Sequence, residues 1–285
     1  MSFLSIKLNP AGDVNLFKPT ATPSKKLLLL ILVAGILNFL AEATIRFFVR
    51  DRSFADGLVV TIHLITFVII PFIITGVPKK DVLIFFSPLF IIFLATNILI
   101  KQRVLGDLFN FSYFLSWPVF YWVFTRNRNK LKNIGLSLKK WPDILIYGIG
   151  TGLFFAGHLF FVVNLAPDIK FLENGLSKII PGVLMEVGFG AIAMELFFRG
   201  FLFNQIFNSL KLSYGLAAAL STFFYIIPFF TNPLFISNAA TLVATIFYTL
   251  VIGYTLCYIY KKTESIFAGI IANLIIATFR MLIIG

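Results

Sequence analysis

A glutamate and an arginine stand four positions apart inside a long apolar run of this chain. They are Glu195 and Arg199, in the stretch AMELFFRG. On a helix, side chains four positions apart share a face, so the opposite charges can pair and lower each other's burial cost. A charged side chain at the centre of a membrane helix costs about 2.5 to 3.5 kcal/mol. The pair is therefore either an ion pair that only stabilises the structure or part of a functional site. Glu42 and Arg46 repeat the spacing, and we expect them to form an ion pair near a helix end.

The histidines and the cysteine do not suggest a metal or cofactor site. The chain has one cysteine and two histidines, His63 and His158, and both histidines precede the Glu195 segment. Neither histidine has a second ligand three or four positions away, the usual spacing for holding a zinc ion on a helix. No cofactor and no metal are expected. A catalytic site rebuilt from His63 or His158 approaching Glu195 or Glu186 is an open alternative.

Three stretches in the C-terminal half carry a resemblance to a known family. The Glu195 stretch resembles the Glu-Glu-x-x-x-Arg motif of the CPBP intramembrane proteases, also called Abi, which include the type II CAAX prenyl endopeptidases and bacteriocin-processing proteins. Residues 220–225 resemble the lead-in to the family's Phe-x-x-x-His motif, and residues 253–254 with 263–273 resemble its closing segment. The resemblance covers roughly residues 140 to 285 and implies a helical membrane bundle.

The resemblance also implies where the catalytic residues of an active member would fall. In active relatives, the first glutamate of the pair and the histidine of the second motif activate water, while a histidine and an Asn or Asp four positions later assist with the oxyanion. Such chemistry needs a base beside the water and donors aimed at the developing charge. In this chain those positions hold Met194, Pro228 (or Phe229 with a shift of one), Asn273 and Ala277.

The catalytic set implied by the family is thus degenerate. A thioether cannot take a proton from water, and proline offers neither a base nor a backbone donor. What remains of the family site is Glu195 with Arg199, in a supporting role, and Asn273 as a possible hydrogen-bond donor.

The elements that position these residues are expected to be membrane helices. The chain has 285 residues, of which 59% are hydrophobic and only 13% are charged. A hydrocarbon core about 30 Å thick needs roughly 20 apolar residues per helix, and lipid offers the backbone no hydrogen-bond partner. We therefore predict an all-α polytopic transmembrane bundle of eight or nine spans. The apolar stretches lie roughly at 27–47, 58–77, 82–100, 108–125, 143–165, 179–205, 213–230, 238–260 and 265–284.

The basic residues predict an orientation. With the N-terminus in the cytoplasm, most of the 24 lysines and arginines fall in cytoplasmic segments, as is usual for membrane proteins. The net charge of +12 then reflects topology, and nothing in the chain matches a nucleic-acid-binding motif. We expect a multi-pass protein of the plasma membrane, bacterial in origin because its loops are short and it shows no retention signal. The lipid bilayer is one partner, and nucleic acid is not.

A basic linker divides the predicted helices into two groups. Gly135 and Pro142 are breakers within it. The expected organisation is an N-terminal four-helix region over residues 1–125, a cytoplasmic linker over 126–142 and a CPBP-like domain over 143–285.

Three functions remain open. The first is a catalytically inactive CPBP relative whose cavity binds a transmembrane protein, a lipidated protein or a bacteriocin-like peptide. The second is an active intramembrane endopeptidase in which Glu195 is the base and Asn273 polarises the scissile carbonyl. The third is a membrane transporter, supported only by the number of helices and by scattered polar residues such as Asn38.

Overall fold

The computed structural model describes residues 25–49, 55, 58–59, 62–63, 65–87, 91, 116–131, 134–164, 191–227 and 239–283. All regular elements in this part of the chain are helices, which confirms the predicted all-α fold class. The elements used below are α1 (Lys25–Phe48), η1 (Ile65–Ile69), α3 (Ile70–Ile74), α6 (Ser116–Arg126), α7 (Arg128–Leu131), α8 (Trp141–Asn164), α10 (Ala191–Met194), η4 (Glu195–Phe203), η5 (Gln205–Ser209), α11 (Tyr214–Ile226), α13 (Ala239–Thr263) and α14 (Phe267–Ile283).

Each predicted apolar stretch overlaps a helix wherever the structure describes it. Large parts of the stretches at 82–100, 108–125 and 179–205 lie outside the described residues. Among the described helices, Trp141–Phe161 is the one that is long and apolar enough to cross a membrane, while Ile65–Ile74, Tyr214–Ile226 and Phe267–Arg280 are apolar but shorter. The number of spans therefore stays a prediction.

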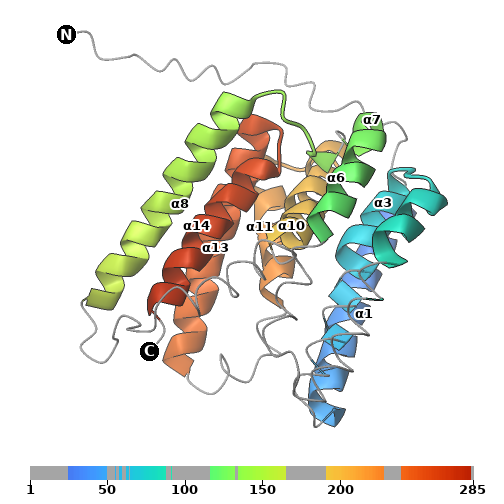
Figure 1. The fold of residues 1–285 in the computed structure, drawn as a ribbon. Helices are drawn as coiled ribbons and strands as arrows, with labels where there is room; N and C mark the ends of the chain where they lie inside the picture. The colour runs from blue at the N-terminus through green and yellow to red at the C-terminus, as the bar shows by residue number, and fades with distance from the viewer. Residues whose placement is uncertain are drawn as a thin grey trace.

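The helix α14 lies between α8 and the group formed by α10, η4 and α11 (Figure 1). It can approach α8 closely because α8 presents glycines to it. A Cβ added at Gly148 would lie 2.9 Å from the carbonyl oxygen of Ala268, and one added at Gly152 would lie 2.8 Å from Cβ of Ile275. Small residues at this spacing are typical of helix pairs packed in membranes, where close backbone approach replaces the hydrophobic drive.

The segment between α7 and α8 is packed into the C-terminal helices. Ile134 and Leu136 are fully buried, and Gly135 has a positive φ of 79°. The carbonyl of Gly135 accepts a hydrogen bond from the amide of Ile266 at 2.9 Å. A Cβ at Gly200 would overlap the Ile134 carbonyl, so η4 rests directly on this segment. The basic linker therefore helps to fix η4 against the start of α14.

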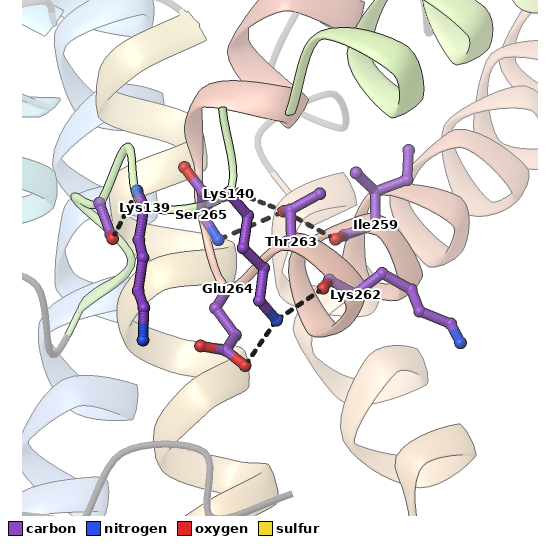
Figure 2. A network of polar contacts seen from close by, with 8 residues as sticks. Lys139, Lys140, Ile259, Lys262, Thr263, Glu264 and Ser265 are labelled. Carbon is purple, nitrogen blue, oxygen red and sulfur yellow. Dashed lines mark hydrogen bonds and ion pairs between the residues drawn. The ribbon is translucent and has the colours of Figure 1, made fainter. Parts of the chain in front are cut away.

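The turn between α13 and α14 is stabilised by its own polar side chains (Figure 2). Thr263 donates to the carbonyl of Ile259 at 2.9 Å and accepts from the amide of Ser265 at 3.3 Å. Glu264 has a φ of 56°, a left-handed conformation typical of a residue that ends a helix. The hydroxyl of Ser265 then accepts from the amide of Phe267 at 3.2 Å, at the start of α14. These contacts set the angle at which α14 leaves the turn.

Candidate functional site

Glu195 and Arg199 lie in a widened helix at the centre of the C-terminal half. The element η4 is a nine-residue π-helix that continues α10, and π-helical turns are rare and often occur at functional sites. Both side chains are 1% exposed, and Nη1 of Arg199 lies 3.1 Å from Oε1 of Glu195. The ion pair predicted from the spacing is therefore present.

Asn273 reaches the same carboxylate from α14. Its Nδ2 donates a hydrogen bond to Oε1 of Glu195 at 2.9 Å. One helical turn earlier, Gly269 faces the other carboxylate oxygen, and a Cβ added there would overlap Oε2 of Glu195. The carboxylate is thus held between a guanidinium on its own helix and an amide on the neighbouring helix, with α14 backbone closing one side.

Arg199 connects this carboxylate to two further helices. Its Cζ lies 4.6 Å from the ring centroid of Tyr225 on α11, within the range of a cation–π interaction, and Cys257 on α13 lies beside it. Within the described residues, no nitrogen of this guanidinium makes a hydrogen bond of good geometry. Its burial is therefore compensated by the Glu195 charge and the Tyr225 ring, and the site joins four elements: η4, α11, α13 and α14.

The positions that the family resemblance assigns to catalysis carry no base in this structure. Met194 is partly buried and packs against the hydrophobic core. Ala277 is 4% exposed on α14, one turn after Asn273. Pro228 lies outside the described residues. Met194 and Ala277 thus put apolar side chains where the family resemblance implies a glutamate and an Asn or Asp, and Asn273 stands where it implies a histidine.

Neither histidine contacts Glu195 in the described part of the chain. Nε2 of His63 lies 3.2 Å from Oε2 of Glu42, and Oε1 of Glu42 lies 2.9 Å from Nε of Arg46, the second ion pair that the spacing predicts. The His63 ring stacks on Phe67. The His158 ring stacks on Tyr248 at 5.7 Å between centroids. The alternative site rebuilt from a histidine next to Glu195 is therefore not formed in this arrangement.

Among the described residues, no three His, Cys, Asp or Glu side chains come close enough to share a metal ion. The residues that line the polar site are Glu195, Arg199, Tyr225, Cys257, Gly269 and Asn273. Chemically, this set can hold a buried negative charge in a fixed position. No described histidine stands beside it to exchange protons with a substrate.

Sequence reasoning missed Gly269 and Tyr225. The signal for Gly269 was available, because it precedes Asn273 by one helical turn and a glycine at that spacing leaves room for a facing side chain. The Gly148-x-x-x-Gly152 spacing likewise signals the close approach of α8 and α14. No local signal marks Tyr225, because its role depends on how α11 packs against η4.

A comparison with family models matches residues 176–279 to the type II CAAX prenyl endopeptidase Rce1-like family. The matched segment contains every residue of the polar site. No curated protein and no solved structure matches the chain. Residues 176–279 are therefore similar to the Rce1-like family of type II CAAX prenyl endopeptidases, which agrees with the family resemblance seen in the sequence.

Proposed function

We propose that this protein is a membrane-embedded, catalytically silent relative of the CAAX-type endopeptidases that binds a membrane-protein segment or a lipidated peptide without cutting it. The observation that carries the proposal is the state of Glu195. Its carboxylate is 1% exposed, one oxygen is held by Arg199 and Asn273, and the other faces Gly269. A general base must reach the proton that it abstracts, directly or through one water. A carboxylate enclosed in this way serves to hold η4 and α14 together.

Membrane embedding is supported by the apolar surface of the described helices. Large side chains on α8 and α13 are strongly exposed, including Ile146 at 68%, Phe154 at 69% and Phe247 at 66%. Exposed apolar faces of this size are unusual in water and ordinary in lipid. The plasma membrane, a bacterial source and a cytoplasmic N-terminus are part of this proposal.

One observation favours the second candidate function, an active endopeptidase. Asn273 and Glu195 are already in hydrogen-bond contact, so a small opening between η4 and α14 would expose a carboxylate beside an amide donor. Loss of one oxyanion donor alone can cost about 10²- to 10³-fold in rate. The missing first glutamate and histidines therefore weigh against this candidate.

The test is proteolysis in nanodiscs with prenylated and membrane-spanning peptides as substrates. The wild type, Glu195→Gln and a Met194→Glu, Pro228→His, Asn273→His triple variant would be compared, with thermal melting to verify that each variant is folded. We expect no cleavage by the wild type. Cleavage that appears only in the triple variant would show that the wild-type site can still accommodate a peptide and lacks only the catalytic side chains.

Cleavage by the wild type that disappears in Glu195→Gln would contradict catalytic silence and make Glu195 the base. For the binding function, the wild-type chain would be crosslinked in native membranes and the recovered polypeptides identified. A specific transmembrane or lipidated partner is expected. Recovery of none from a folded, membrane-embedded chain would count against the proposal.

A further inference from the structure

Three connections meet at one end of the helix bundle and bring lysines together there. The amide of Ile266, in the α13–α14 turn, donates to Gly135 in the linker. Nζ of Lys261 lies 5.2 Å from the ring centroid of Phe207 on η5 and 5.1 Å from that of Tyr214 on α11. These contacts join the linker, the η5–α11 loop and the α13–α14 turn into one face. The lysines on this face are Lys139, Lys140, Lys211, Lys261 and Lys262.

One of these lysines is neutralised inside the fold. Nζ of Lys140 lies 2.9 Å from Oε1 of Glu264 and 3.4 Å from the carbonyl oxygen of Lys262. Figure 2 shows this ammonium group turned toward the turn, whereas the side chain of Lys262 extends away from Glu264. Asp143, an acidic residue next to the linker, lies in the first turn of α8, where a carboxylate complements the helix dipole.

The remaining lysines have no carboxylate partner within the described residues. Lys139 and Lys262 are exposed, and Nζ of Lys262 lies 5.6 Å from the centroid of the Tyr258 ring. A cation–π contact holds an ammonium group near a ring without cancelling its charge. The side chains of Lys261 and Lys262 are therefore positioned, yet their charges stay available to an anion.

Amphipathic rings border the lysines. Trp141 is 60% exposed at the start of α8, while Tyr254 is 42% and Tyr258 is 40% exposed near the end of α13. Tryptophan and tyrosine with this exposure are enriched at the level of lipid headgroups, where one part of the ring is apolar and the other is wet. The face therefore combines positioned cations with the aromatic side chains typical of a membrane boundary.

We infer that Lys139, Lys261 and Lys262, bordered by Trp141 and Tyr258, form a binding surface for the headgroups of anionic phospholipids. The inference rests on the proposed membrane embedding, which places this end of the bundle at the headgroup layer. A lipid phosphate carries the negative charge that would neutralise these ammonium groups. Each basic residue near an anionic leaflet contributes roughly fivefold to binding at low salt, and the attraction fades within a Debye length as salt is added.

The test measures binding of dansyl-labelled phosphatidylglycerol to the full chain in neutral detergent micelles, with dansyl-labelled phosphatidylcholine as the neutral probe. We expect the Lys139→Gln, Lys261→Gln, Lys262→Gln triple variant to lose roughly fivefold in phosphatidylglycerol affinity per lysine removed, with unchanged phosphatidylcholine binding. Salt should reduce the difference. Lys140→Gln should lower the melting temperature and keep the lipid preference, because this lysine ties the turn and does not face the headgroups.

Arg280→Gln is the matched control, since it removes one exposed cation from the opposite end of α14. Equal phosphatidylglycerol affinity in the triple variant and the wild type, or an equal loss per charge in Arg280→Gln, would overturn the inference. Membrane embedding is tested separately by washing native membranes with alkaline carbonate. A chain that stays in the membrane but shows no lipid preference refutes only the headgroup surface, whereas a chain released by the wash refutes the proposed embedding.

Discussion

At the scale of single residues, the polar site is defined by how Glu195 is surrounded. Removing one partner of a buried ion pair is far more costly than its net contribution suggests, because the charge that remains is uncompensated. Arg199 supplies the opposite charge and Asn273 supplies a donor, both to Oε1. The orientation of the Asn273 amide is therefore as important as its presence. A donor is required on this side of the carboxylate, and an acceptor would be repelled.

We predict that Asn273→Asp destabilises the protein by about 3 to 5 kcal/mol, because it places a second carboxylate against Glu195 in a buried site. Adding Glu195→Gln to this variant should restore much of the loss, since one carboxylate and one amide then remain beside Arg199. Thermal or denaturant unfolding in micelles would measure both changes. Asn129→Asp, an exposed asparagine outside the site, is the control and should shift stability only slightly. An unaltered melting temperature in Asn273→Asp would show that the hydrogen bond to Glu195 is unimportant.

At the scale of elements, α14 acts as the link between the polar site and α8. One side of α14 presents Gly269 and Asn273 to Glu195, while Ala268 and Ala272 lie against the glycines of α8. A helix with close contacts on two sides has little freedom to move. The position of Asn273 therefore depends on the fit between α8 and α14 as well as on the turn that precedes α14.

We predict that Gly148→Ala or Gly152→Ala destabilises the protein by about 1 to 3 kcal/mol, because the added methyl group meets α14 and the helices must separate. Gly150→Ala is the matched control on the same helix, where an added Cβ has nothing within 4 Å. That change should be neutral or stabilising by up to about 1 kcal/mol through helix propensity. Unfolding measured in one detergent for all three variants would check this. Equal effects at positions 148 and 150 would contradict the proposed close packing.

At the scale of the whole molecule, the described helices place the loops rich in lysine at the same end. The loop after α3 is tied to α7 by the ammonium group of Lys130, which donates to the carbonyl of Gly76 at 2.6 Å. The linker is tied to the α13–α14 turn by Lys140. If the bundle spans a membrane, the excess of basic residues favours placing this end on the cytoplasmic side.

We predict that a cysteine introduced at this end is reached only from the cytoplasm. The chain has one cysteine, Cys257, which is buried, so Cys257→Ala provides a background without accessible thiols. In intact cells, a membrane-impermeant maleimide should label Arg280→Cys and leave Lys262→Cys unlabelled until the membrane is permeabilised. The reverse pattern would invert the orientation. Labelling of both positions before permeabilisation would contradict a membrane-spanning bundle.

Several features of the fold could be predicted from short-range patterns. The helical class follows from continuous apolar runs, and the pairs Glu195–Arg199 and Glu42–Arg46 follow from four-residue spacing. The contact of Glu195 with Asn273 could not be predicted, because it joins residues 78 positions apart in sequence. The contact of His63 with Glu42 could not be predicted either, since it depends on the register in which two antiparallel helices pack.

The sequence by itself indicated that this protein is built from apolar helices and that two glutamate–arginine pairs are spaced to form within them. It also indicated that the positions matched to the catalytic residues of CAAX-type endopeptidases hold Met194, Pro228, Asn273 and Ala277. These properties depend on residue type and on spacing within one or two helical turns. Only the tertiary structure decided that the pair is enclosed by α11, α13 and α14, that Gly269 and Asn273 close over the carboxylate, and that the linker supports η4 at Gly200. The physical reason is that burial and hydrogen bonding between distant segments depend on how helices pack, and apolar helix surfaces allow many packings with similar local patterns.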